Sequence, residues 1–339
     1  MEIQDIQKVR TALQRIRKIA IVFHFNPDGD ALGSALALYH HFSDEGYEVS
    51  VISPNLYPSF LNWMPGSDQI IVAQQHPKKA VTALLQAEML FIVDMNAPHR
   101  AGQELEKAIT QSTAFKVLID HHVEPDIDCD VMYSTAQTSS ASELVYDFLY
   151  RYLFPERTFT AAIAEVLYVG IITDTGSVTY ACNCPSTYEV LEKIIASGID
   201  GEAIHRKIYD NYSESRIRLL GLTLSQRLKI MPEYGASYMY LTHEDLITHH
   251  YQIGDTEGFV NYGISLGNVH YTAFFTERDN RIRVSFRSKG QVDVNKLARK
   301  YFNGGGHHNA AGAFYDGPIE EALAYFEKAV KEIAAQGLE

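Results

Sequence analysis

The chain has 339 residues, of which 46% are hydrophobic and 11% are aromatic, and its formal net charge is −13 at pH 7. This length favours two domains, each with its own hydrophobic core. The acidic balance argues against a general polyanion-binding surface, because such binding depends on clustered Lys and Arg residues. The N-terminus has helical rather than signal-peptide character and no apolar run reaches about 18 residues, so we expect a cytoplasmic protein without a membrane span.

Apolar runs alternate with stretches of helical periodicity through the first part of the chain. Continuous apolar runs that end abruptly at polar residues predict buried parallel strands, at 19–25, 48–53, 89–94 and 116–122. Between these runs, apolar residues recur at helical spacing over 31–46, 80–87 and 98–110. Two further helices are expected after residue 133, and the second ends at 172–177. The alternation predicts an α/β domain of residues 1–190, built on a doubly wound, mainly parallel sheet.

The pattern changes after residue 190. Residues 191–228 have helical periodicity and are predicted to connect the first domain to a smaller α+β domain of residues 229–339. In that second domain we expect a strand at 236–243, a helix at 256–266, a β-hairpin at 269–288 with its turn at 278–281, a helix at 293–303 and a final helix from 319 to 335. Residues 278–300 contain eight basic residues and two aspartates, which we call the basic island.

Four short segments place Asp or His at or directly after the end of an apolar run, at 24–34, 92–96, 118–122 and 172–177. In the first of them, Pro27 and Gly29 permit a tight turn that brings Asp28 and Asp30 together before a helix. A cation would relieve the repulsion between these carboxylates, and ligands of open α/β folds bind beyond the strand ends. Each segment alone is also explained by an ordinary turn, cap or loop. Together they predict one shared site.

The candidate ligands indicate the class of metal. Aspartates supply oxygen and histidines supply nitrogen, a hard mixture that suits Mn²⁺ or Mg²⁺ better than structural zinc; they are His24, Asp28, Asp30, Asp94, His121 and Asp174. A carboxylate that bridges two such ions gives the arrangement in which a bound water is acidified and aimed at phosphorus. A phosphoryl transition state needs further positive charge, for which His122, His307 and the basic island are the candidates.

These motifs amount to a family resemblance over nearly the whole chain. Asp120-His121-His122, together with segments 24–34 and 172–177, resembles the DHH phosphoesterase superfamily, which includes RecJ-type exonucleases, family II pyrophosphatases and nano-RNA/phosphoadenosine-phosphate phosphatases. The resemblance implies two divalent cations, Mn²⁺ with Mg²⁺ or Co²⁺ as alternatives. It places His24, Asp28 and Asp94 on one ion, and Asp30, Asp94, His121 and Asp174 on the other, so that Asp94 is the bridge. The predicted catalytic residues are Asp94, His122 on the substrate phosphate, and Asp120, which orients an imidazole.

The glycine-rich run at 304–314 resembles the GGGH motif of the DHH-associated domain. This resemblance implies that Gly304, Gly305, Gly306 and His307 contact a phosphate or nucleotide. Consecutive glycines allow backbone N–H groups to approach an anion closely, although a flexible turn would have the same composition. Arg287 lies in a strand that resembles the family's arginine-bearing strand, and we expect it to bind phosphate in a bidentate manner.

The choice of subfamily rests on length, the connector and residues 256–262, which resemble the short oligoribonuclease and 3′-phosphoadenosine-5′-phosphate (pAp) phosphatase group. We therefore predict hydrolysis of short oligoribonucleotides (nano-RNA), of pAp, or of both, by a protein that could form a homodimer. A cyclic-dinucleotide phosphodiesterase is one alternative. A non-catalytic RNA-binding protein is another, because the C-terminal domain also resembles the appended domain of alanyl-tRNA synthetases. Residues 176–186 depart from the family pattern, since close relatives often carry an aromatic residue and an arginine there.

Overall fold

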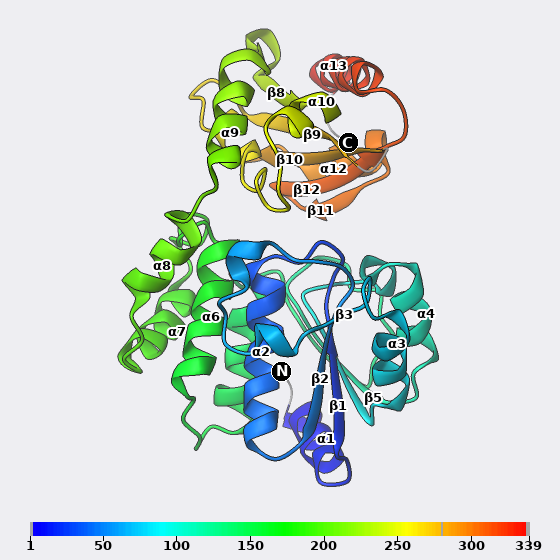
Figure 1. Cartoon of the computed structure of the whole chain (residues 1–339), viewed down its shortest axis with the longest axis vertical. Coiled ribbons are helices and arrows are strands. Elements are labelled where there is room, and N and C mark those ends of the chain that lie inside the picture. Colours follow the sequence, from blue (N-terminus) through cyan, green and yellow to red (C-terminus); the bar gives the residue numbers. More distant parts are fainter. Residues whose placement is uncertain (1–2, 279–280, 337–339) are drawn as a thin grey trace. The chain divides into compact units, whose positions relative to one another are not determined.

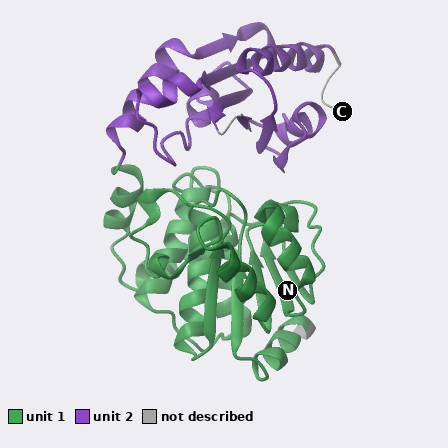
Figure 2. Cartoon of the chain, turned by 45° about the vertical axis from the view of Figure 1, so that its right-hand side comes forward, with its two compact units in different colours: residues 1–211 green, residues 212–339 purple. Residues whose placement is uncertain are grey.

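The computed structural model describes residues 3–278 and 281–336. The chain divides into two compact units, residues 1–211 and residues 212–339 (Figure 2). This division falls inside the segment 191–228 that was predicted as a connector. Of the helices there, α7 (Pro185–Ala196) and α8 (Gly201–Tyr209) belong to the first unit, and α9 (Glu214–Gln226) belongs to the second.

The first unit is built on a six-stranded sheet in which every neighbouring pair of strands is parallel. The strand order is β3-β2-β1-β4-β5-β6, with β1 (Lys18–Val22), β2 (Glu48–Ser53), β3 (Ile71–Val72), β4 (Met89–Val93), β5 (Phe115–Asp120) and β6 (Val131–Ser134). The predicted doubly wound parallel sheet is therefore confirmed. The direction of winding reverses between β1 and β4, and such a switch point is where open α/β sheets bind ligands.

Helices cover both faces of this sheet (Figure 1). One face carries α1 (Ile3–Leu13), α2 (Gly29–Asp44), α5 (Ala141–Tyr146), the π-helical turn η4 (Asp147–Leu153) and α6 (Ala161–Asp174), and the other carries α3 (Pro77–Gln86) and α4 (Gln103–Gln111). Alternate residues of β1 point to the two layers: Ile19 and Ile21 join the α2 and α6 core, whereas Ala20 and Val22 join the α3 and α4 core. Burial on both sides explains why β1 and β4 are almost continuously apolar. Short 3₁₀ turns complete the unit, at η1 (Ser59–Leu61), η2 (Ser67–Gln69) and η3 (Pro98–Ala101).

Helices α2 and α6 pack unusually closely because glycines face each other. A Cβ atom at Gly33 would lie 2.5 Å from the carbonyl oxygen of Val166 and 3.0 Å from the Cα atom of Gly170. A Cβ atom at Gly170 would in turn collide with the side chain of Ser142 in α5. Any larger residue would force these helices apart. The contact matters for function because α2 begins, and α6 ends, at a predicted metal ligand.

The second unit contains a six-stranded sheet of order β11-β12-β10-β9-β8-β7, in which only β8 and β9 are parallel neighbours. Its strands are β7 (Leu228–Met231), β8 (Ala236–Leu241), β9 (Tyr271–Arg278), β10 (Arg281–Ser288), β11 (Gly305–His307) and β12 (Ala310–Tyr315). Its remaining helices are η5 (Pro232–Tyr234), α10 (His243–Thr248), α11 (Val260–Ile264), α12 (Val294–Phe302) and α13 (Ile319–Gln336). Phe275, Phe286 and Phe326 centre a core between the sheet and helices α12 and α13.

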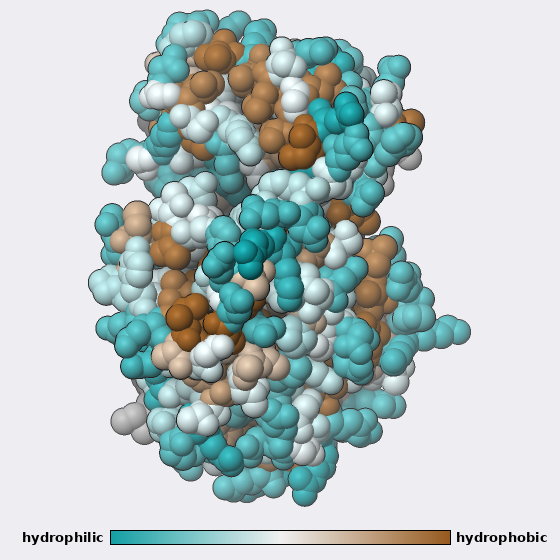
Figure 3. All heavy atoms as spheres, turned by 60° about the vertical axis from the view of Figure 1, so that its left-hand side comes forward, coloured by the Kyte–Doolittle hydropathy of each residue, from teal (hydrophilic) through white to brown (hydrophobic). Residues whose placement is uncertain are grey.

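The glycine-rich run and the β-hairpin of the second unit differ in how far the structure tests their predictions. A flexible turn was the alternative explanation for the glycine-rich run, but its residues form the antiparallel strands β11 and β12. The hairpin of β9 and β10 is present, whereas Asp279 and Asn280 of its predicted turn lie outside the described residues. Among the residues that the structure describes, no helix combines the length and apolar character that crossing a membrane requires. On the face drawn in Figure 3, hydrophobic side chains form separate patches within a largely hydrophilic surface.

Candidate metal centre

The predicted metal ligands come together at the carboxyl-terminal edge of the first unit's sheet. His24 follows β1, Asp94 follows β4 and His121 follows β5, while the others stand at helix ends: Asp28 and Asp30 begin α2, and Asp174 ends α6. Two clusters result, each of three side chains whose ligand atoms lie within 4.8 Å of one another: His24 with Asp28 and Asp94, and Asp30 with Asp94 and His121. Asp94 is common to both.

Asp94 has the geometry of a bridging carboxylate. Its Oδ2 atom lies 3.2 Å from Nε2 of His24, and its Oδ1 atom lies 3.3 Å from Nε2 of His121. The two oxygens therefore face different imidazoles and different clusters. The Nδ1–H group of His24 donates to the carbonyl oxygen of Phe25 at 2.9 Å, so Nε2 is the nitrogen that can bind an ion.

Asp28 and Asp30 are held by backbone N–H groups from different helices. Asp28 caps α2 by accepting hydrogen bonds from the N–H groups of Asp30 and Ala31, at 3.0 and 3.1 Å. The fully buried Asp30 accepts from the N–H groups of Ala141 and Ser142 at the start of α5, at 2.7 and 2.8 Å. These bonds orient both carboxylates toward the cluster without using a basic side chain, which leaves their charge for a cation.

Asp174 lies beside the second cluster. Its Oδ2 atom lies 3.7 Å from Nε2 of His121, and Oδ2 of Asp30 lies at the same distance from that nitrogen. As the last residue of α6, Asp174 adds a negative charge to the helix end that already carries the negative end of the dipole. A cation beside it would relieve this unfavourable placement.

The pKa shifts show how much negative charge the site concentrates. Burial, together with the neighbouring carboxylates of Asp94 and Asp174, raises the pKa of Asp30 well above its usual range. Burial opposes a charge on His121, but its hydrogen bond to Asp94 and the carboxylates of Asp174 and Asp30 raise its pKa to about 10. Burial also opposes ionisation of Asp94, yet contacts with His121 and His24 hold its pKa well below the usual range. The cluster therefore attracts positive charge, which protons supply when no ion does.

Asp120 and His122 form a pair beside the two clusters. Nδ1 of His122 donates to Oδ1 of Asp120 at 2.7 Å, and the backbone N–H group of His122 donates to Oδ2 at 3.1 Å. Asp120 is fully buried, and burial with the charge of Asp94 raises its pKa to about 6. The carboxylate thus fixes the orientation of the imidazole, as a residue that supports a catalytic histidine does.

Features that the sequence interpretation did not reveal also shape this edge. Asp94 and Asn26 have left-handed backbone conformations, with φ of 53° and 55°, which are strained for residues other than glycine and cluster at functional sites. Asn55, after β2, holds the first turn by accepting from the N–H group of Asn26 at 2.7 Å and donating to its side chain at 3.1 Å. The charge of Arg100 acts on His24 and Asp120, and its Nη1 atom is buried without a hydrogen-bond partner among the described residues.

Apart from His122, the predicted substrate-binding residues lie in the second unit, where two of them share a row of the sheet. His307 of β11 and Arg287 of β10 both pair with Ala310 of β12. Directly paired residues of antiparallel strands point to the same face, so these two side chains flank one small residue at a separation of about 10 Å between backbones. Arg283 lies on this face as well, because it is four residues from Arg287 along the strand.

The three glycines of the motif have different roles. A Cβ atom at Gly304 would lie 2.3 Å from the carbonyl oxygen of Gly312, and one at Gly306 would lie 2.4 Å from that of Ala310. Both positions therefore need glycine for close strand packing. Their N–H groups are also engaged within the unit, Gly304 with the carbonyl oxygen of Ala298 and Gly306 with Oδ1 of Asn295. Gly305 alone has space around its Cα atom.

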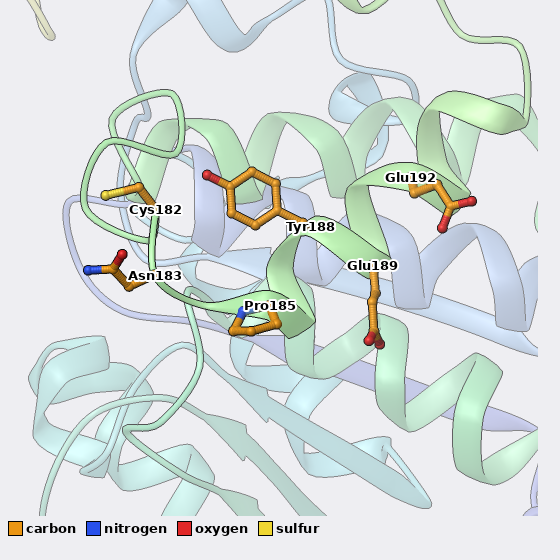
Figure 4. Close-up of a pocket in the computed structure, with 6 residues that line it drawn as sticks. All are labelled: Cys182, Asn183, Pro185, Tyr188, Glu189 and Glu192. Atoms are coloured by element: carbon orange, nitrogen blue, oxygen red, sulfur yellow. The ribbon is translucent and has the colours of Figure 1, made fainter.

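A separate hollow of the first unit contains none of these ligands. It lies between α7 and the loop before it, and Figure 4 shows the residues that line it: Cys182, Asn183, Pro185, Tyr188, Glu189 and Glu192. Within the described part of the chain, no cluster of His, Cys, Asp and Glu able to hold an ion includes any of them. The chemistry therefore belongs to the sheet edge.

Comparison with known families agrees with this geometry. Residues 18–171 match the model described as the DHH family, N-terminal domain, and residues 249–336 match that of the DHHA1 domain. The chain belongs to the DHH family. With its buried His and Asp clusters it is a metal-dependent phosphoesterase, and hence a hydrolase.

Three similar proteins illustrate the range within this DHH family. The bifunctional oligoribonuclease and PAP phosphatase NrnA of Bacillus subtilis (strain 168) is 26% identical over 292 residues, which are 86% of this chain and 87% of that protein. The cyclic-di-AMP phosphodiesterase GdpP of Geobacillus thermodenitrificans (strain NG80-2) is 24% identical over 96% of this chain and 49% of that protein. A crystal structure of an exopolyphosphatase-related protein from Bacteroides fragilis superposes with a TM-score of 0.91 and 38% identity, covering 99% of this chain and 98% of that one.

Proposed function

We propose that this DHH phosphoesterase uses two Mn²⁺ ions to hydrolyse short oligoribonucleotides, pAp, or both. The observation that carries the two-ion part is the Asp94 carboxylate, whose two oxygens face the imidazoles of two different ligand clusters. The nucleotide part is supported by the similarity to a bifunctional oligoribonuclease and PAP phosphatase over most of both chains.

In this proposal each ion has its own ligands and shares Asp94. His24, Asp28 and Asp94 would hold the first ion, and Asp30, Asp94, His121 and Asp174 the second. When bound, the ions would supply an acidified water and offset charge on the phosphoryl group. The oxygen-rich ligand set with two imidazoles favours Mn²⁺, with Mg²⁺ and Co²⁺ as weaker candidates.

The chain's own residues have further tasks. Asp120 holds the His122 ring in place, so that this ring can bind and orient a phosphate oxygen of the substrate. In the second unit, Arg287 and His307 face the same side of the sheet across Ala310, a spacing that suits an anion bound between two cationic or donor groups. Gly305 is the glycine of the motif whose surroundings leave room for a phosphate. The second unit therefore acts as the substrate-binding part in this proposal.

The direct test is a substrate panel with purified protein and Mn²⁺. The panel contains pAp, a linear dinucleotide, a cyclic dinucleotide, a long single strand and pyrophosphate. We expect turnover of the dinucleotide, of pAp, or of both, and loss of turnover on chelation. Turnover of the long strand alone, or of pyrophosphate alone, would refute the proposed substrate class.

A cyclic-dinucleotide phosphodiesterase is the second candidate, supported by the similarity to GdpP over almost the whole of this chain. The same panel separates the two, because an enzyme of that kind would open the cyclic substrate faster than it cleaves the linear one. The non-catalytic RNA-binding alternative is not retained, because the chain is a DHH phosphoesterase whose six proposed ligand positions are all occupied by Asp or His.

A further inference from the structure

Two exposed aromatic rings adjoin the metal centre. Of the described residues of the first unit, the exposed aromatic side chains are Phe25, Tyr152, Tyr180 and Tyr188. Phe25 directly follows the ligand His24, and Tyr180 lies in the loop that follows the ligand Asp174. Exposed aromatic rings are common singly. Here one of them follows a ligand of the first cluster and the other follows Asp174, a ligand proposed for the second ion.

Phe25 is fixed on the side of the sheet that α4 covers. The residue is 47% exposed, while its backbone N–H group donates to the carbonyl oxygen of Arg100 at 2.6 Å. The ring rests against Gly102, the residue before α4, where a Cβ atom would lie 3.6 Å from Cδ2 of Phe25. The ring thus has a defined support and an open face.

Tyr180 is fixed on the other side, which α6 covers. Its side chain is 64% exposed, and its ring lies over Gly176, where a Cβ atom would be 2.8 Å from Cε2 of Tyr180. Gly176, Ser177 and Val178 all adopt left-handed conformations, with φ of 56°, 57° and 68°. Such a run is strained, above all at a β-branched residue, and strained backbone accumulates where function requires it.

Several hydrogen bonds hold this loop in place. Ser177 Oγ lies 2.8 Å from Nε2 of His205, and its N–H group donates to the carbonyl oxygen of Ile172 at 2.8 Å. The N–H group of Tyr180 donates to the carbonyl oxygen of Thr175 at 3.0 Å. The loop therefore presents the ring from a fixed backbone close to Asp174.

We propose that Phe25 and Tyr180 are two base-stacking platforms, one on each helix layer of the first unit, that flank the metal pair. A substrate with a nucleoside on each side of the cleaved phosphodiester would place one base on each ring, whereas a mononucleotide would use only one. The platforms select linear dinucleotides as the best substrates. This inference rests on the proposed function, since it specifies the substrate of the same site.

The test combines protein variants with substrates that lack a base. The substrates are a linear dinucleotide, the same compound without its 5′ base, and the same compound without its 3′ base. The variants are Tyr180→Ala and Phe25→Ala, with Tyr180→Phe and Phe25→Tyr to keep the ring. Tyr152→Ala is the control, because Tyr152 is also exposed but lies beside α1, to whose Arg10 its carbonyl oxygen is hydrogen-bonded.

On the complete dinucleotide, each alanine variant should lose roughly 5- to 150-fold in kcat/KM, the range expected for one stacked base, with the loss mainly in KM. The loss should disappear on the substrate that lacks the base stacked on the substituted ring. That base should be the 5′ base for one variant and the 3′ base for the other. The ring-keeping variants and Tyr152→Ala should remain within about threefold of wild type. Bound Mn²⁺ per chain should not change in any variant.

Other outcomes overturn the platforms. Equal losses on all three substrates would mean that the substitutions disturb the ligands rather than the bases, and no loss on the complete dinucleotide would mean that the rings contact nothing. If wild type hydrolyses neither these compounds nor pAp, the proposed function fails. In that case calorimetry measures the affinity of the Mn²⁺-loaded wild type and variants for the three compounds. Each alanine variant should then bind the complete dinucleotide more weakly than wild type does, and should bind the compound without the matching base equally well.

Discussion

The close contact between α2 and α6 makes Gly33 a sensitive test of how the fold sets the metal site. We expect Gly33→Ala to lower both stability and metal affinity. The added Cβ atom would lie 2.5 Å from the carbonyl oxygen of Val166 and must move by about 0.5 Å to reach 3.0 Å, a limit that real Cβ atoms essentially never cross. The obstacle is backbone, so no side chain can rotate away and the helices themselves must separate.

The magnitude follows from two opposing effects. Overpacking of this kind costs about 1–3 kcal/mol, and replacing glycine by alanine inside a helix returns about 1 kcal/mol, so we expect a net loss of up to about 2 kcal/mol. The same displacement moves Asp30, three residues before Gly33, relative to Asp174, four residues after Gly170. A shift of that size in a ligand set should weaken Mn²⁺ binding roughly ten- to hundredfold.

Urea unfolding of the metal-free protein measures the first effect, and Mn²⁺ titration measures the second. Gly221→Ala is the matched control, because Gly221 is an exposed residue inside α9 with nothing within 4 Å of its added Cβ atom. That variant should be more stable than wild type by up to about 1 kcal/mol and should bind Mn²⁺ normally. If Gly33→Ala behaves like Gly221→Ala in both assays, the close packing does not position the ligands.

Three further outcomes are expected. Asp94→Ala should bind neither ion and lose at least about a hundredfold in activity, and metal analysis that finds one full equivalent would contradict a bridge. Arg287→Ala should raise KM roughly ten- to hundredfold with metal content unchanged. Arg281→Ala should leave KM unchanged, because in wild type the Arg281 side chain already pairs with Asp316 at 2.7 Å. Burial lowers the pKa of His41 to about 4, so below pH 6.5 the unfolded chain takes up a proton on this residue before the folded protein does. Between pH 7 and pH 4 the free energy of unfolding of wild type should therefore fall by up to about 3 kcal/mol more than that of His41→Asn, as measured by urea unfolding.

The sequence interpretation succeeded where a strand is buried on both faces. The runs 19–25, 48–53, 89–94 and 116–122 correspond to β1, β2, β4 and β5, because the parts of a strand that helices cover on both sides are mostly apolar. The edge strands β3 and β6 were not predicted. β3 has only two residues, and Met132 in β6 is exposed, so neither produces a continuous apolar run.

The glycine-rich run shows why local composition can mislead. Glycine is unfavourable in strands and typical of turns, so the composition of residues 304–314 favoured a turn and no strand was predicted there. In the structure, Gly304 and Gly306 are required because β11 approaches the backbone of β12 too closely for any side chain. The requirement for glycine comes from the neighbouring strand. It cannot be predicted from the residue preferences of one segment.

The metal centre combines local and distant causes in the same way. Polar residues at strand ends were enough to predict which side chains meet, since parallel strands end at one edge. Nothing in the first segment indicates that the start of α5, more than a hundred residues later, holds Asp30. The left-handed backbone conformation of Asp94 could not be predicted either, because aspartate, unlike glycine, is not typical of that conformation.

These supports explain how the first unit can keep several carboxylates together before any ion binds. Asp28 is held by the first turn of its own helix, Asp30 by the first turn of another, and Asp94 by two imidazoles. Each partner donates a hydrogen bond to a carboxylate oxygen, and together these bonds hold the three carboxylates close to one another. The conformational cost of assembling the ligands is therefore met by folding rather than by metal binding, which is the condition for ligands that must hold fixed positions during catalysis.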